Sequence, residues 1–173
     1  MNNAFDLACC VEDRALNDLM PFLEQKSFNG RFVLTSKGRL SKFLQKEIGD
    51  VVLNTSLKNV ASVEIKSEQE NKYGNLFLET WSNRQRFTVG WMYTLNADFL
   101  FYYFIENRQL FICNFQALKK WAFIDSNIYK YTEKPQSKYT QLNDTWGRCV
   151  PINILKNEVC FKEYILEDET IPF

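Results

Sequence analysis

A carboxylate and an ammonium group are two residues apart in the stretch Glu64-Ile65-Lys66. Because side chains of a β-strand alternate between its two faces, Glu64 and Lys66 would share one face of an extended segment. Asp50 opens the preceding apolar run, and Glu79 lies in the following one. On three neighbouring strands, Asp50, Glu64 and Glu79 could ligate one Mg²⁺ or Mn²⁺ ion. The chemistry predicted is metal-assisted hydrolysis of a phosphodiester bond, with Lys66 stabilising the developing charge.

The amino-acid composition excludes several other chemistries. The 173 residues include no histidine, which rules out Ser/His and Cys/His nucleophile pairs and histidine-bound zinc. The five cysteines include the adjacent pair Cys9 and Cys10 and no C-x-x-C spacing, so we expect reduced thiols rather than disulfides or structural zinc.

Charge and hydropathy place the chain among cytoplasmic proteins of one domain. The 21 basic and 21 acidic residues give a net charge of zero, and hydrophobic residues make up 46% of the chain. No apolar run is long enough for a membrane helix, and the first residues do not have the pattern of a signal peptide. We therefore expect a single domain over residues 1–173, with no membrane partner.

The elements that must position these residues are predicted from periodicity. A helix is expected over residues 6–25, interrupted or ended near Pro21, with its acidic side chains facing solvent. A short extended segment at 31–35 and a helix at 37–48 follow. Strands at 50–53, 60–66 and 76–81 should form an antiparallel meander, followed by a helix at 97–105 and a strand at 109–113. Beyond these we expect a short helix at 117–123, a polar loop at 129–143 and a strand at 148–155, near a sheet edge because of Pro151.

The order of these helices and strands, together with the spacing of Asp50, Glu64 and Lys66, resembles the PD-(D/E)xK, or restriction-endonuclease-like, nuclease superfamily. The resemblance rests on Asp50, a gap of thirteen residues and then Glu64-Ile65-Lys66, and it covers roughly residues 37–114. It implies an α/β (α+β) fold with an αβββαβ core, in which a central mixed sheet is flanked by helices, with an N-terminal helix and a C-terminal extension added. Gly49 stands where the superfamily motif has proline.

A narrower resemblance is carried by longer strings of residues. The segments 63–68, 74–83 and 90–91, Ala97-Asp98, Tyr102-Tyr103-Phe104 and Val150-Pro151-Ile152 are similar to small phage, plasmid and bacterial proteins with this nuclease-like core. The resemblance implies a fold and a reaction class, and no particular substrate.

Two assignments of the superfamily motif stay open. In the first, Asp50 is the motif aspartate and Glu64 and Lys66 form its E-x-K. In the second, Glu64 takes the aspartate place and Glu79 the glutamate place, with Trp81 at the usual lysine position and Lys66 supplying the ammonium from the adjacent strand. Because tryptophan carries no charge, the second assignment implies a degenerate site.

The predicted nuclease site also suggests accessory and substrate-binding residues. Gln45 could orient the attacking water or the phosphate, and Glu68 could be an additional metal ligand. Trp91 and Tyr93 could stack on bases, although core packing is the alternative for both. Phosphate contacts would come from a basic helix and a later loop, namely Lys37, Arg39, Lys42, Lys46, Arg84 and Arg86.

The function expected is that of an Mg²⁺- or Mn²⁺-dependent endonuclease acting on DNA, with RNA not excluded. The alternative is an inactive protein of the same fold that binds nucleic acid or a host protein, as a phage or mobile-element accessory factor would. Whether the protein forms a homodimer stays open.

Overall fold

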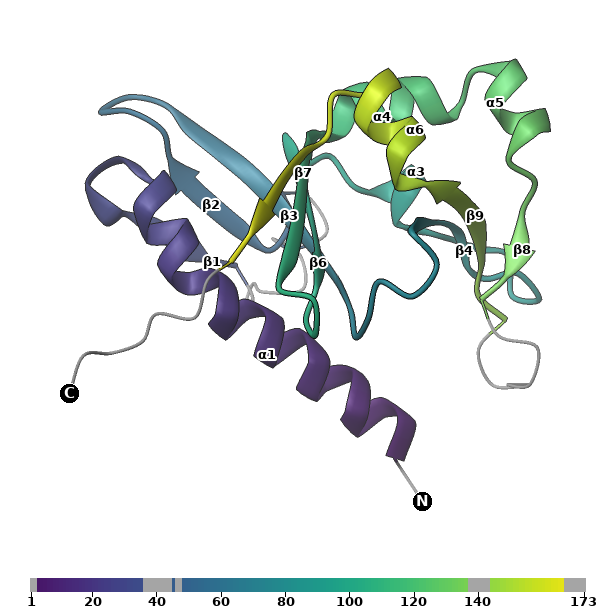
Figure 1. Cartoon of the computed structure of the whole chain (residues 1–173), viewed down its shortest axis with the longest axis horizontal. Coiled ribbons are helices and arrows are strands. Elements are labelled where there is room, and N and C mark those ends of the chain that lie inside the picture. Colours follow the sequence, from purple (N-terminus) through teal and green to yellow (C-terminus); the bar gives the residue numbers. More distant parts are fainter. Residues whose placement is uncertain (1–2, 36–44, 46–47, 137–143, 167–173) are drawn as a thin grey trace.

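The N-terminal helix α1 (Asn3–Lys26) packs its apolar stripe against a β-sheet. The computed structural model describes residues 3–35, 45, 48–136 and 144–166 (Figure 1). Ala15, Leu19 and Leu23 are fully buried at intervals of four residues, as expected for one helix face. The helix does not end near Pro21 as predicted, because buried residues on both sides of the exposed proline hold the backbone helical to Lys26.

The sheet beneath α1 is mixed and has six strands. Its order is β1 (Phe32–Leu34), β2 (Val51–Asn54), β3 (Val60–Glu68), β6 (Phe99–Phe104), β7 (Gln109–Asn114) and β10 (Lys162–Ile165). All neighbours are antiparallel except β3 and β6, which run parallel. The expected α+β class with a mixed central sheet is therefore confirmed.

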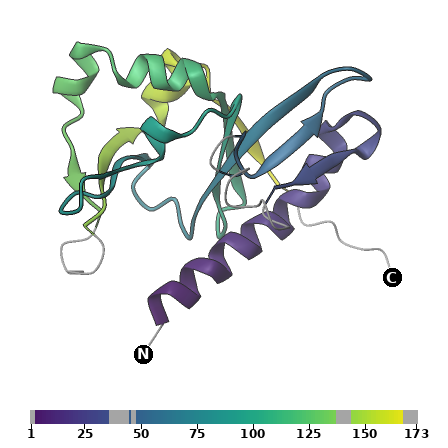
Figure 2. The ribbon, with the colours of Figure 1, turned by 180° about the vertical axis from the view of Figure 1, so that it is seen from behind.

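A second, antiparallel sheet lies beside the first (Figures 1 and 2). Its order is β5 (Thr88–Val89), β4 (Asn75–Asn83), β9 (Trp146–Pro151) and β8 (Lys134–Pro135). The short helices near it are α3 (Trp91–Thr94), α4 (Phe115–Ala122), α5 (Asp125–Lys130) and α6 (Ile152–Glu158). A 3-10 turn, η1 (Phe28–Gly30), follows α1.

Two hydrophobic cores lie between these layers. One lies between α1 and the six-stranded sheet and contains Val63, Phe101 and Tyr103. The other joins the opposite face of that sheet to the second sheet and its helices, through residues such as Tyr102 and Leu76. Of the helices in the described ranges, none combines the length and apolar character needed to cross a membrane.

Several predicted elements differ from the observed ones. The expected helix at 97–105 is wrong, since Phe99–Phe104 forms β6, a strand between β3 and β7. The three-strand meander is also wrong, because β4 pairs with β5 and β9 rather than with β3. The last predicted strand ends at Pro151, where α6 begins, and β9 is an inner strand of its sheet. The predicted loop at 129–143 contains β8, and 137–143 lie outside the described residues.

The remaining predictions for the backbone hold where the structure describes them. The extended segment at 31–35, the strands at 50–53, 60–66, 76–81 and 109–113, and the helix at 117–123 match observed elements within a few residues. The helix at 37–48 lies mostly outside the described residues, of which Gln45 and Ile48 are helical.

Candidate functional site

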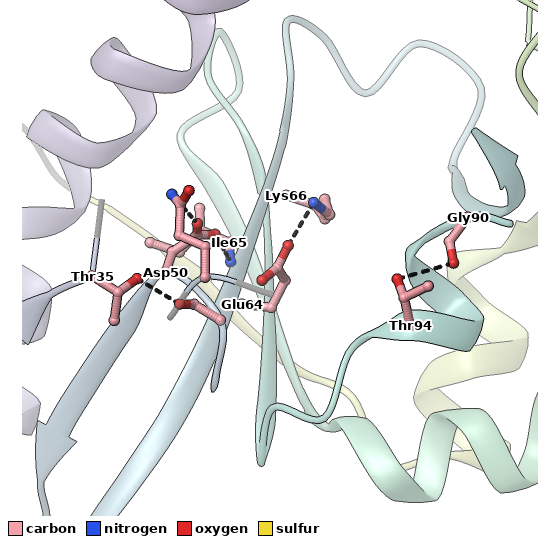
Figure 3. Close-up of polar contacts among 9 residues, drawn as sticks. Thr35, Asp50, Glu64, Ile65, Lys66, Gly90 and Thr94 are labelled. Carbon is pink, nitrogen blue, oxygen red and sulfur yellow. Dashed lines mark hydrogen bonds and ion pairs between the residues drawn. The ribbon is translucent and has the colours of Figure 1, made fainter. Parts of the chain in front are cut away.

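Glu64 and Lys66 project from the same face of β3, as their spacing predicted. Their side chains point toward each other, with the Lys66 Nζ 2.6 Å from the Glu64 Oε1 (Figure 3). The Glu64 side chain is 5% exposed and the Lys66 side chain 32%, so the carboxylate is enclosed while the lysine side chain is partly exposed. The parallel register pairs Glu64 with Leu100 and Lys66 with Tyr102, which places both on the face that looks toward the second sheet.

Asp50 is held at the start of β2 by contacts with β3. Its backbone N–H donates to the Val63 carbonyl at 2.8 Å, and its Oδ2 accepts from the Ile65 N–H at 2.9 Å. The residue before it must be glycine, because Gly49 has φ +81° and a Cβ there would lie 2.6 Å from the Val63 carbonyl oxygen. The backbone of Gly49 thus allows the approach that fixes Asp50 beside the Glu64 strand.

Gln45 contacts the site through Asp50. Its Nε2 donates to the Asp50 Oδ1 at 3.2 Å. With the Ile65 bond, both carboxylate oxygens of Asp50 then accept a hydrogen bond, which fixes the plane of the carboxylate. The structure therefore places Gln45 as a positioning residue for Asp50, while its predicted contact with water or phosphate stays a prediction.

These residues line a cavity of about 390 Å³. Asp50, Glu64, Lys66 and Gln45 all contribute to it, and Trp91 of α3 forms part of its wall. The Lys66 Nζ lies 5.7 Å from the centroid of the Trp91 ring, a cation–π arrangement. Asp50, Glu64 and Lys66 thus lie together at one cavity, and their assignment to the superfamily motif stays a prediction.

Two acidic residues of α1 also line this cavity, and the sequence analysis missed them. Glu12 and Asp13 were expected only to face solvent, yet both lie at the cavity. Glu12 is near enough for its charge to raise the pKa of Glu64. Nothing in the helix periodicity distinguishes them from other exposed acids of α1, because their position depends on how the helix crosses the sheet.

Glu79 approaches Lys66 from the second sheet. The prediction that it lies on a strand adjacent to β3 is wrong, since β4 belongs to the other sheet. Its carboxylate nevertheless interacts electrostatically with Lys66 and accepts a hydrogen bond from the backbone N–H of Trp91. Gly90 permits this approach, because a Cβ there would lie 2.8 Å from the Glu79 Cγ. Glu79 is not among the residues lining the 390 Å³ cavity.

Trp81 does not replace a lysine in this site. Its indole N–H donates to the Glu133 Oε2 at 3.2 Å. A register shift between Glu79 and Trp81 also interrupts their regular alternation along β4. The second motif assignment required β4 beside β3, and the observed topology contradicts it.

Burial and charge set the protonation of the central pair. Burial raises the pKa of Glu64 to about 7; Lys66 opposes this shift, and the charges of Asp50 and Glu12 add to it. Burial alone would lower the pKa of Lys66, but Glu64, Asp50 and Glu79 outweigh it, so the net shift is upward. Burial likewise raises the pKa of Glu79, against the opposing effects of Lys66 and the Trp91 N–H. The ammonium of Lys66 is thus charged at neutral pH, near two carboxyl groups, Glu64 and Glu79, whose pKa values are raised.

The oxygen donors of this site suit a hard divalent cation only in part. Within the described ranges, no three acidic, cysteine or histidine side chains are placed so that together they could hold a metal ion. The pair Asp50 and Glu64 remains, and Mg²⁺ is commonly held by one or two carboxylates together with waters and substrate phosphates. Burial is the main cause of the raised pKa of Glu64, and a bound divalent cation would favour its ionised form.

Glu68 belongs to a different environment from Glu64. Its Oε1 accepts a hydrogen bond from the hydroxyl of the buried Tyr102, and it lines a second cavity rather than the first. Burial raises its pKa, and the Tyr102 bond opposes that shift. The structure therefore does not bring Glu68 together with Asp50 as an additional ligand.

The predicted phosphate-binding residues are only partly described. Lys37, Arg39, Lys42 and Lys46 lie outside the described residues. Arg84 and Arg86 are exposed in the turn between β4 and β5, where the Arg84 guanidinium stacks 4.2 Å from the centroid of the Trp146 ring.

The two aromatic residues proposed for stacking have different surroundings. Trp91 is half-buried and packs on Phe115, with ring centroids 5.9 Å apart. Tyr93 is 46% exposed and lies against Phe123 at 4.7 Å. Trp91 therefore combines core packing with a place in the cavity wall.

Comparison of the chain with models of protein families, with curated proteins and with solved structures finds no match in any of the three.

Proposed function

We propose that the protein is a metal-dependent endonuclease that hydrolyses phosphodiester bonds in DNA. The observation that carries the proposal is the cavity where the carboxylates of Asp50 and Glu64 meet the ammonium of Lys66. The cavity is concave, and Lys66 is accessible from it, as a site acting on an anionic substrate requires.

Five residues of the site have a role in this proposal. Asp50 and Glu64 would hold the Mg²⁺ or Mn²⁺ ion, with Gln45 keeping the Asp50 carboxylate in place. When bound, the ion supplies Lewis-acid charge that lowers the pKa of water. Lys66 stabilises the negative charge that develops on the phosphoryl oxygens. Glu79, from the second sheet, helps to keep Lys66 charged.

The proposed substrate is DNA, bound through its phosphates and independently of base sequence. Arg84 and Arg86 are exposed on one turn and can neutralise phosphates. RNA presents the same phosphates, so a test on both polymers belongs to the proposal. We further propose that the protein acts in the cytoplasm.

Two observations favour a second candidate function, an inactive protein of this fold that binds nucleic acid or a host protein. The Lys66 ammonium already pairs with the Glu64 carboxyl group at 2.6 Å, and the described residues assemble no three-ligand metal cluster. In that case the cavity would bind phosphate or protein groups without cutting.

The proposal is tested by incubating supercoiled plasmid with the purified protein in Mn²⁺, in Mg²⁺ and in EDTA. We expect metal-dependent nicking that falls at least about 100-fold in Lys66→Ala, because a charge-stabilising group in the transition state is lost. Lys58→Ala is the matched control, since Lys58 is exposed in the turn between β2 and β3, and it should nick like the parent protein.

The two candidate functions give different results with the metal alone. An active site should bind Mn²⁺ in calorimetry and lose that binding in Glu64→Ala. Two results together would reject the nuclease and leave the binding function: no nicking in any metal, and Mn²⁺ titrations that are the same for the parent protein and Glu64→Ala.

A further inference from the structure

A second cavity, of about 600 Å³, adjoins the site at the far end of β3. Ser67 of β3 and Glu12 of α1 line both cavities, so the two are continuous along the strand. Glu68 lies two residues beyond Lys66, about 6.6 Å further along the strand. A polymer with a phosphate at Lys66 would therefore extend into the second cavity.

Residues of β4 form another part of the wall of this cavity. Asn75, Leu76 and Phe77 of β4 all line the cavity; Leu76 is fully buried in the core, whereas Asn75 and Phe77 are only partly buried. The Phe77 ring lies against the backbone of Gly147, where an added Cβ would be 2.7 Å from its Cζ. An aromatic ring is thus held in the wall by a neighbour that has no side chain.

The polar groups of the cavity suit an uncharged ligand with a hydrogen-bonding edge. In the described part of the chain the Asn75 amide has no hydrogen-bond partner, so its donor and acceptor are both available. The acids Glu12, Glu68 and Glu70 outnumber the one base, Lys72, among the lining residues. In the first cavity the proposed metal ion would offset the acidic side chains, but no such ion is proposed here. The excess of negative charge in the second cavity therefore disfavours a phosphate and favours a neutral group such as a nucleobase.

We infer that the second cavity takes one unpaired nucleobase of the strand whose phosphate lies at Lys66, stacked on Phe77 with its polar edge toward Asn75. The volume is within the range of about 300–1,000 Å³ typical of ligand pockets. The inference rests on the proposed function and specifies its substrate, a nucleic acid with an unpaired nucleotide next to the scissile phosphate. A base within an uninterrupted duplex cannot enter the cavity without being flipped out.

The test is a binding measurement in EDTA, so that no cutting occurs. Fluorescence anisotropy at low salt compares a short fluorescein-labelled duplex carrying one bulged adenine with the same duplex carrying an abasic bulge. We expect the adenine bulge to bind about tenfold more tightly, as stacking of one base on one aromatic ring allows. Phe77→Leu and Asn75→Ala should each reduce this preference, while the exposed Asn59→Ala should retain it.

The outcomes separate this inference from the proposed nuclease. Equal affinity for the two duplexes, a preference retained in both variants, or no binding of either duplex by the folded protein would overturn the base pocket. Base-dependent binding by a protein that never nicks plasmid would support the pocket while rejecting the nuclease, whereas nicking without base preference would do the reverse. Circular dichroism verifies that each variant is folded, and Asn75→Ala, which removes only a half-buried amide, keeps the test valid if Phe77→Leu does not fold.

Discussion

At the scale of single residues, the buried carboxyl group of Glu64 links the stability of the fold to pH. Its pKa is raised from 4.5 to about 7 in the folded protein, mainly by burial, so the folded state holds the proton more tightly than the unfolded chain. The contribution of this group to the unfolding free energy is therefore fully present below pH 4.5, the pKa in the unfolded chain. About 3 kcal/mol of that contribution is lost as the pH rises to 7. Glu68 and Glu79, whose pKa values are also raised, act in the same direction.

We predict that Glu64→Gln flattens this dependence. Urea unfolding between pH 5 and pH 8, at about one-unit intervals, should show a fall in unfolding free energy for the parent protein that is smaller in the variant by up to about 3 kcal/mol. Glu24→Gln, on an exposed position of α1, should follow the parent curve. Superimposable curves for Glu64→Gln and the parent would show that Glu64 titrates normally.

Part of the site could be predicted from single residues, and part could not. The alternation of strand side chains is local, so Glu64 and Lys66 were assigned correctly to one face. Glu12 could not be found, because its place at the cavity depends on how α1 crosses the sheet, and no local pattern encodes that crossing. For Glu79 the proximity to Lys66 was predicted but the route was wrong, since it arrives from another sheet.

At the scale of elements, the turn at Gly49 fixes the distance between β2 and β3 where Asp50 lies. We predict that Gly49→Ala destabilises the protein by about 2–4 kcal/mol, because the new Cβ meets the Val63 carbonyl and the φ of +81° is unfavourable for alanine. Gly30→Ala is the matched control, since Gly30 has φ +65° and nothing lies within 4 Å of its added Cβ. Its cost should be about 1–2 kcal/mol.

Thermal and urea unfolding of the two alanine variants measure the difference directly. A larger loss for Gly49→Ala would assign the excess to the contact between the two strands, and equal losses would show that the strands can separate to accept a methyl group. Metal-dependent nicking should fall in Gly49→Ala alone, because only that change displaces Asp50.

The expected helix at 97–105 shows why one element type could not be predicted. Phe99–Phe104 is a run of six apolar and aromatic residues that is covered on both faces, so it shows neither the period of a helix nor that of a half-buried strand. Its aromatic composition favours a strand, and the hydrogen-bonded pairing with β3 and β7 stabilises it as one.

At the scale of the whole molecule, the hydroxyl of Tyr102 joins the two sheets. It donates to Glu68 of β3 and accepts from the Phe77 N–H of β4 at 3.3 Å, inside the core between the sheets. We predict that Tyr102→Phe lowers the unfolding free energy by about 1–3 kcal/mol, because a carboxyl group and a backbone N–H lose their partner. The loss should also loosen β4 relative to β3.

Native-state hydrogen exchange tests this coupling. In Tyr102→Phe the Phe77 amide should exchange faster, while amides of β7 change no more than global stability requires. Tyr103→Phe is the control, since the Tyr103 hydroxyl donates to Asp18 of α1 at 3.1 Å on the other face of the sheet. Equal acceleration of the Phe77 amide in both variants would contradict a specific bridge between the sheets.

The division into two sheets could not be predicted from sequence. The alternation of apolar residues in β4 identifies a strand, but its partner β9 lies about seventy residues later in the chain. Long-range pairing of this kind leaves no local signal, and the nearer β3 was the natural but incorrect partner. The antiparallel pairing of β2 with β3 was predicted correctly, because the two strands are joined by a short turn. The mixed sheet was expected only from the resemblance, and it is the parallel pairing of β3 with β6 that makes the sheet mixed.

The position of Trp91 gives the molecule an optical reporter of its own site. Its indole lies in the cavity wall beside the ammonium of Lys66, and indole emission responds to nearby charge. The other three tryptophans donate their N–H groups to Glu133, Glu158 and Asp144, in or beside the second sheet. A change of charge at Lys66 would therefore be recorded mainly in the fluorescence of one side chain, without any label.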